Sequence, residues 1–155
     1  KKTEHVGALL ERAITELQAN RLLHPLDIRV NFTLYSLYNY AHQLTGDTNF
    51  LAQSEAEIRT GLQHSQKRQQ FEYALAQNLV LQERIEEAKE VLRTSVNNNG
   101  KIAEGWYRLA ALELSGEDGV VRAQQVINEA IEKGALFNDA QVSGLRDAGL
   151  SVNIE

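Results

Sequence analysis

The feature that most constrains the fold is a pattern of small and large side chains that recurs about every 34 residues. Three segments each carry a small residue, a large aliphatic residue four positions later, and a second small residue three positions after that. These triads are Ser54, Ile58 and Gly61; Ala88, Leu92 and Ser95; and Ala123, Ile127 and Ala130, with corresponding members 34 or 35 residues apart. Spacings of four and three place the members of one triad on one face of an α-helix. The chain therefore repeats a helical unit.

Small residues on a helix face let a neighbouring helix approach closely, and the larger residue between them fills the groove that remains. A leucine in place of Ala88 would add volume to a close-packed seam, at a cost of about 1 to 3 kcal/mol. We therefore expect all three triads to be buried where helices stack. Gly61, Ser95 and Ala130 test this expectation most sharply, because they would point into solvent if it were wrong.

Apolar side chains at spacings of three and four predict helices along most of the chain. The expected ranges are 3–23, 26–44, 48–64, 68–82, 85–96, 102–114, a seventh helix that ends at 133, and a shorter helix over 138–148. Turn signals between them are Pro25, Thr45-Gly46-Asp47, Gly100 after a run of asparagines, and Gly134. We expect Thr48 or Asn49 to cap the third helix. The sequence predicts an all-α protein of about seven helices plus a short C-terminal capping helix.

The residues of the repeat match a known pattern in several places. Trp106, Leu109 and Ala110 fit its opening W-x2-L-G, and Ala123 and Ile127 fit its middle A-x3-F. The preceding unit fits through Leu75, Ala76, Leu79, Ile85, Ala88 and Leu92, and the earliest through Leu34, Tyr38, Ser54, Ile58 and Gly61 with seven extra residues. The chain thus resembles the tetratricopeptide repeat family over residues 26–134. It departs from the family at Glu113, where tyrosine is preferred, and in lacking the closing prolines.

This resemblance implies an antiparallel helix-hairpin solenoid, wound as a right-handed superhelix, in a single domain over residues 1–155. Its parts would be an N-terminal helix, a repeat with an insertion, two regular repeats and a C-terminal cap. Their expected ranges are 1–25, 26–66, 67–100, 101–135 and 136–155.

Two stretches support a narrower resemblance. HPLDIRVNFTLYSLYNY and SQKRQQFEYALAQ are similar to the soluble tetratricopeptide region that follows the membrane-spanning part of bacterial O-antigen ligase or polymerase-type proteins. That resemblance implies an extracytoplasmic domain, attached to the membrane only through a segment outside this chain, with the glycan-transferring site in that segment. The chain begins at Lys1 and contains no methionine, so we expect it to be part of a longer protein. Without the narrower resemblance a cytoplasmic location is expected.

Composition and motifs argue against several classes of function. The net charge of -5 and the scattered Lys and Arg residues disfavour nucleic-acid binding, and Lys67 and Arg68 are interpreted as solvated charge at a helix junction. The chain has no cysteine, and none of its four histidines has a partner at metal-ligand spacing. A phosphate-binding glycine loop and a serine nucleophile elbow are also missing. The sequence predicts no enzyme, no metal site and no cofactor.

What remains is a surface formed by the first helix of each hairpin, which lines the concave side of such a stack. Phe32, Tyr73 and Tyr107 occupy one row of that surface at intervals of 41 and 34 residues. With neighbouring rows, the expected binding face comprises Arg29, Phe32, Ser36, Asn39, Tyr40, Gln70, Tyr73, Gln77, Glu104 and Tyr107. Aromatic rings flanked by amides suit an extended peptide or a glycan. Ordinary packing between helices is the alternative reading of the same rings.

The leading hypothesis is a non-catalytic scaffold for protein–protein interaction that presents this concave groove to a peptide or partner protein. The alternative is an accessory soluble domain of a cell-envelope O-antigen ligase or polymerase-type membrane protein. The lysine and asparagine clamp with which some family members grip a C-terminal carboxylate does not occur in these rows.

Overall fold

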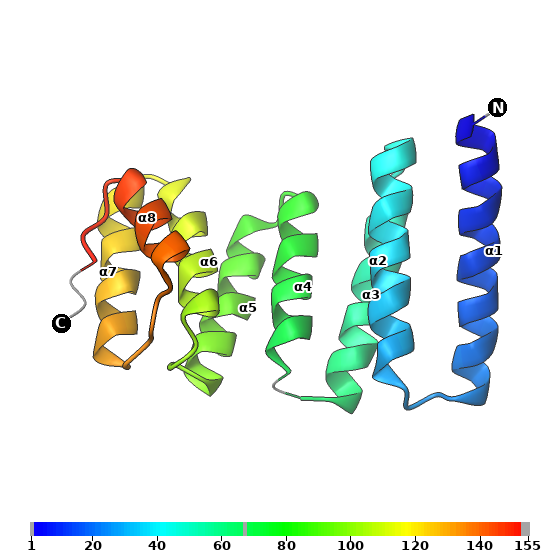
Figure 1. Cartoon of the computed structure of the whole chain (residues 1–155), viewed down its shortest axis with the longest axis horizontal. Helices are drawn as coiled ribbons and strands as arrows, with labels where there is room; N and C mark the ends of the chain where they lie inside the picture. The colour runs from blue at the N-terminus through cyan, green and yellow to red at the C-terminus, as the bar shows by residue number, and fades with distance from the viewer. Residues whose placement is uncertain (1, 67, 153–155) are drawn as a thin grey trace. The chain divides into compact units, whose positions relative to one another are not determined.

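The computed structural model describes residues 2–66 and 68–152, and over these ranges the chain is all-α, without strands (Figure 1). Eight helices lie in the described ranges: α1 (Lys2–Leu23), α2 (Ile28–Thr45), α3 (Asn49–His64), α4 (Gln69–Leu81), α5 (Ile85–Asn98), α6 (Ala103–Leu114), α7 (Gly119–Glu132) and α8 (Asp139–Asp147). This confirms the predicted fold class and the order of the elements. None of the described helices combines the length and the apolar character needed to cross a bilayer.

The helices form two compact units, α1–α4 and α5–α8, which divide between Glu83 and Arg84. In the first unit α1 packs on α2, α2 on α3 and α3 on α4, and in the second unit α5 packs on α6 and α6 on α7. A superhelix that runs through both units stays a prediction.

The core of the first unit lies where α1 and α3 meet α2. Val30, Leu34 and Tyr38 of α2 are buried, and Ile14 and Leu17 of α1 pack against them. Phe50, at the start of α3, stacks on the Tyr38 ring with a centroid distance of 6.3 Å. The buried residues of α2 thus contact both neighbouring helices.

In the second unit, α6 lies between α5 and α7 and carries the only tryptophan. Trp106 is fully buried, and its indole Nε1 donates a hydrogen bond to the Gly100 carbonyl at 2.8 Å. This bond ties the start of α6 to the connection that precedes it.

All nine triad residues are buried, as the repeat predicts. Seven of them have no exposed surface: Ser54, Ile58, Ala88, Ser95, Ala123, Ile127 and Ala130. Leu92 is 1% exposed, and Gly61 is also buried. Undersized side chains therefore do mark the faces on which these helices pack.

The helix ends follow local chemistry, with one correction. Thr48 occupies the residue before α3 but makes no capping bond through its side chain. Instead, Asp47 Oδ1 accepts from the Asn49 backbone N–H at 2.9 Å, so the prediction that Thr48 or Asn49 caps this helix is wrong. Asp47 follows Gly46, which has a φ of 72°. The Asp47 carboxylate bonds the backbone N–H two residues later, a local turn that aspartate favours. Gly134, with φ of 75°, follows the end of α7 as expected.

Candidate binding face

A buried carboxylate holds the first three helices together. Glu57 of α3 accepts hydrogen bonds from Arg21 of α1 and, at 2.9 Å, from the amide of Asn31 of α2. Nearby, the Gln18 side-chain amide donates to the Tyr38 hydroxyl at 2.8 Å. Burial raises the pKa of Tyr38, and the Gln18 hydrogen bond opposes that rise. These contacts fix α2, which carries one half of the candidate face.

A second buried polar group fixes α4, which carries the other half. Asn78 has no exposed surface, and its amide donates to the Leu51 carbonyl of α3 at 3.1 Å. Gln82 donates to the Asn78 side-chain oxygen at 2.6 Å and to Glu55 of α3 at 2.9 Å. Because α2 and α4 are both tied to α3, their exposed side chains are held at a fixed spacing.

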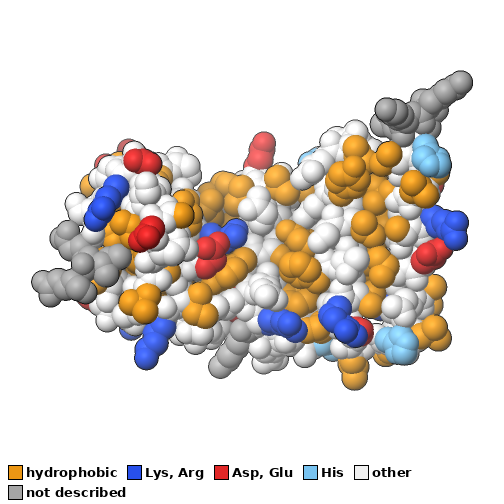
Figure 2. Space-filling view, in the orientation of Figure 1, with side chains coloured by type: hydrophobic (Ala, Val, Ile, Leu, Met, Phe, Trp, Pro, Cys, Tyr) orange, Lys and Arg blue, Asp and Glu red, His pale blue; other side chains and the backbone are white. Residues whose placement is uncertain are grey.

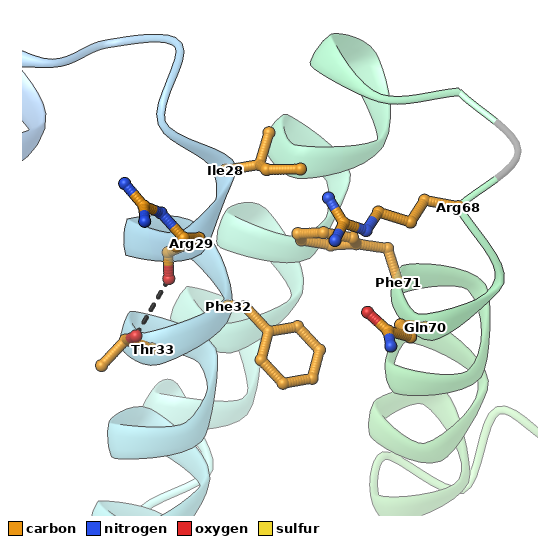
Figure 3. A pocket seen from close by; sticks show the side chains of 7 residues that line it. All are labelled: Ile28, Arg29, Phe32, Thr33, Arg68, Gln70 and Phe71. Atoms are coloured by element: carbon orange, nitrogen blue, oxygen red, sulfur yellow. Dashed lines mark hydrogen bonds between the residues drawn. The ribbon is translucent and has the colours of Figure 1, made fainter.

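Between the first turns of α2 and α4 lies an open pocket of about 200 Å³ (Figure 3). Its lining residues are Ile28, Arg29, Phe32, Thr33, Arg68, Gln70 and Phe71. Three of these, Arg29, Phe32 and Gln70, belong to the predicted binding face. Small-molecule sites usually enclose about 300 to 1,000 Å³, so this pocket suits a single side chain better than a whole metabolite.

Two phenylalanines form the apolar part of the pocket. Phe32 and Phe71 meet edge to face, with ring centroids 5.5 Å apart and planes inclined at 79°. Phe71 is buried, whereas Phe32 is 38% exposed and also contacts Tyr35, with centroids 5.6 Å apart. Phe71 therefore positions the Phe32 ring, and Phe32 offers part of its own ring to a ligand.

Two arginines flank the rings, and their charges are balanced differently. Arg29 pairs with Asp27, the residue before α2, at 2.7 Å and 2.9 Å. The hydrogen bonds from Arg29 lower the pKa of the Asp27 carboxyl to about 2. Arg68 forms no ion pair with any residue of the described ranges, and its side chain points from the start of α4 toward α2 (Figure 3). Among the described residues, the pocket thus has one guanidinium without an ion pair.

The other predicted residues of the first unit are spread along α2 and α4. Tyr40 is 46% exposed, and Gln77 is exposed. Ser36 is exposed but donates to the Phe32 carbonyl at 3.0 Å, and Tyr73 is half-buried. Asn39 is half-buried and accepts from the Ser54 hydroxyl at 2.9 Å, so it supports the seam with α3.

The last two residues of the predicted binding face, Glu104 and Tyr107, lie on α6 in the second unit, where α8 packs on them. Gln141 of α8 donates to the Glu104 carboxylate at 2.9 Å. A methyl group at Gly144 would lie 2.8 Å from the Tyr107 hydroxyl, so this part of α8 lies against Tyr107. A single row through Phe32, Tyr73 and Tyr107 spans both units and stays a prediction.

On the face shown in Figure 2, apolar side chains gather over α2 and α4, with basic side chains near the end where these helices begin. Within residues 2–66 and 68–152, no group of three His, Asp or Glu side chains is placed to hold a metal ion. The pocket between α2 and α4 lies among exposed residues of the predicted binding face.

Sequence reasoning missed the other four residues of the pocket: Ile28, Thr33, Arg68 and Phe71. Arg68 is the residue before α4, where the sequence indicated only solvated charge. A signal for Phe71 was present, since it stands between Gln70 and Tyr73 of the predicted face. Its contact with Phe32, 39 residues away, depends on the path between α2 and α4.

Compared with known proteins, the chain matches no protein-family model and no curated sequence. Both resemblances, to the tetratricopeptide repeat family and to the O-antigen ligase or polymerase-type proteins, therefore rest on the motifs quoted above and stay predictions.

Proposed function

We propose that this protein is a non-catalytic interaction module that binds an extended peptide of a partner protein on α2 and α4. The observation that supports this proposal most directly is the pocket between the first turns of these helices. It combines a partly exposed aromatic ring with polar side chains on its rim, and it has the size of a single side chain.

In this mechanism an apolar side chain of the partner enters the pocket and packs against Phe32. Burying such a side chain contributes about 1.5 to 3 kcal/mol, which alone gives weak binding. Further contacts come from exposed groups along the same helices, where the Gln70 and Gln77 amides and the Tyr40 hydroxyl can hydrogen-bond a peptide backbone.

The test begins with a random 12-residue peptide library displayed on phage and selected against the full chain. Enriched peptides, synthesised with a fluorescein label, are titrated against the wild type and Phe32→Ala. We expect Phe32→Ala to weaken binding about tenfold, because an anchoring contact at the centre of an interface is worth about 1 to 2 kcal/mol.

Leu44→Ala is the matched control for this titration. Leu44 lies on the same helix as Phe32 and has the same 38% exposure, but it is far along α2 from the pocket. Its substitution should leave peptide affinity unchanged, and circular dichroism should show both variants as helical as the wild type. The proposal fails if no peptide is enriched, or if the enriched peptides bind Phe32→Ala as tightly as the wild type.

A further inference from the structure

We propose that the pocket selects a partner segment in which an acidic side chain stands beside the apolar anchor, so that the carboxylate pairs with Arg68. This inference rests on the proposed function, which it deepens by naming the chemistry of the partner.

The first step is the charge of the pocket. Its lining contains two arginines and no acidic residue. Asp27 already pairs with Arg29, whereas Arg68 has no carboxylate partner among the described residues. A ligand that brings a negative charge therefore meets one guanidinium that is still available.

The second step is geometry. Arg68, Phe32 and Phe71 line the same pocket, and in Figure 3 the Arg68 side chain points from the start of α4 toward α2. An apolar side chain seated on the two rings would place the neighbouring residues of its chain beside Arg68. The planar guanidinium can hold a carboxylate through two parallel hydrogen bonds, which a neutral amide cannot reproduce.

The third step is selectivity over the rest of the surface. The chain carries a net charge of -5, so most of its surface disfavours an acidic peptide. At the pocket, the exposed Arg68 instead attracts an acidic side chain. Acidic residues beside the anchor would direct the peptide to this position and weaken its binding elsewhere.

The test uses two tripeptides of nearly equal shape, acetyl-Asp-Phe-Asp-amide and acetyl-Asn-Phe-Asn-amide, the second of which has neutral amides in place of the carboxylates. Each is titrated into the ¹⁵N-labelled full chain and followed by two-dimensional NMR. We expect both to shift the backbone amides of Phe32 and Phe71, and the acidic tripeptide to bind about threefold more tightly, as an exposed ion pair allows. The difference in affinity between the two tripeptides should shrink in about 0.5 M NaCl, because salt at that concentration largely screens exposed charges.

Arg68→Gln should abolish the preference and leave the affinity for the amide tripeptide unchanged. Arg146→Gln, at an exposed arginine on α8, should retain the preference. Equal affinity of the two tripeptides for the wild type, or a preference that survives in Arg68→Gln, overturns this inference but leaves the proposed function standing. If neither tripeptide shifts Phe32 or Phe71, the pocket anchors no side chain and both proposals fall.

Discussion

The ring of Phe71 lies directly against Gly61, with no room for a side chain between them. A methyl group at Gly61 would lie 2.7 Å from Phe71 Cδ1 and 2.8 Å from Cζ. Gly61 is the last member of the first triad, and Phe71 forms the floor of the pocket. The Phe71 ring therefore belongs both to the packing between α3 and α4 and to the candidate site.

Replacing Gly61 by alanine should destabilise the protein by about 1 to 2 kcal/mol, because overpacking exceeds the gain in helix propensity. The free energy of unfolding, measured by urea titration with circular dichroism, gives the value. Gly7→Ala is the control, since a methyl group at Gly7 of α1 has no heavy atom within 4 Å. That substitution should stabilise the protein by about 0.5 to 1 kcal/mol. Equal stability of the two variants would show that the seam is not close-packed.

Arg21→Ala should lower the free energy of unfolding by about 2 kcal/mol, because it removes a charged partner from the buried Glu57 carboxylate. The comparison is Arg12→Ala on the same helix, where the pair with Glu16 is exposed, at 78% and 65% for the two side chains. An exposed pair of this kind contributes little to stability, because solvent screens both charges. If both variants lose the same stability, Arg21 is not needed to hold α1 on α3.

The ion pair at the rim of the pocket predicts a particular acid titration. The pKa of Asp27 is about 2, which lies below the usual value of about 3.9 for aspartate. Its contribution to stability is therefore complete above about pH 4 and is lost as the pH falls through about 2.

The carboxyl ¹³C shift of Asp27, followed by NMR against pH, should give a midpoint of about 2 in the wild type. In Arg29→Gln the midpoint should rise toward the value of a free aspartate, because the charged donor is gone. A wild-type midpoint near 4 would mean that Arg29 is not held by Asp27 and can offer its charge to a ligand.

The helices and their packed faces could be predicted because both depend on local spacing. A period of three and four places Ser54, Ile58 and Gly61 on one face whatever the rest of the chain does, and their burial confirms the inference. Turn chemistry at Gly46 and Gly134 marked two helix ends for the same reason. Some helix bounds shifted by one or two residues, and at α3 Asp47, in place of Thr48, bonds the Asn49 backbone N–H.

The candidate site was only partly predictable, because it depends on contacts between residues far apart in the chain. Phe71 reaches Phe32 across 39 positions, and α8 packs on Tyr107 from a segment whose docking no local pattern specifies. The roles of buried polar residues were also not predicted from the sequence. Glu57 and Asn78 look like surface residues by composition, yet each ties two or more helices together through hydrogen bonds.

The most direct test of the account is to map an enriched, unlabelled peptide onto the ¹⁵N-labelled protein by NMR. The account predicts that the largest shifts lie on α2 and α4, centred on Phe32, Gln70 and Phe71, and that Phe32→Ala weakens them. Shifts confined to α1 or to α5–α8, with Phe32 and Phe71 unaffected, would contradict it.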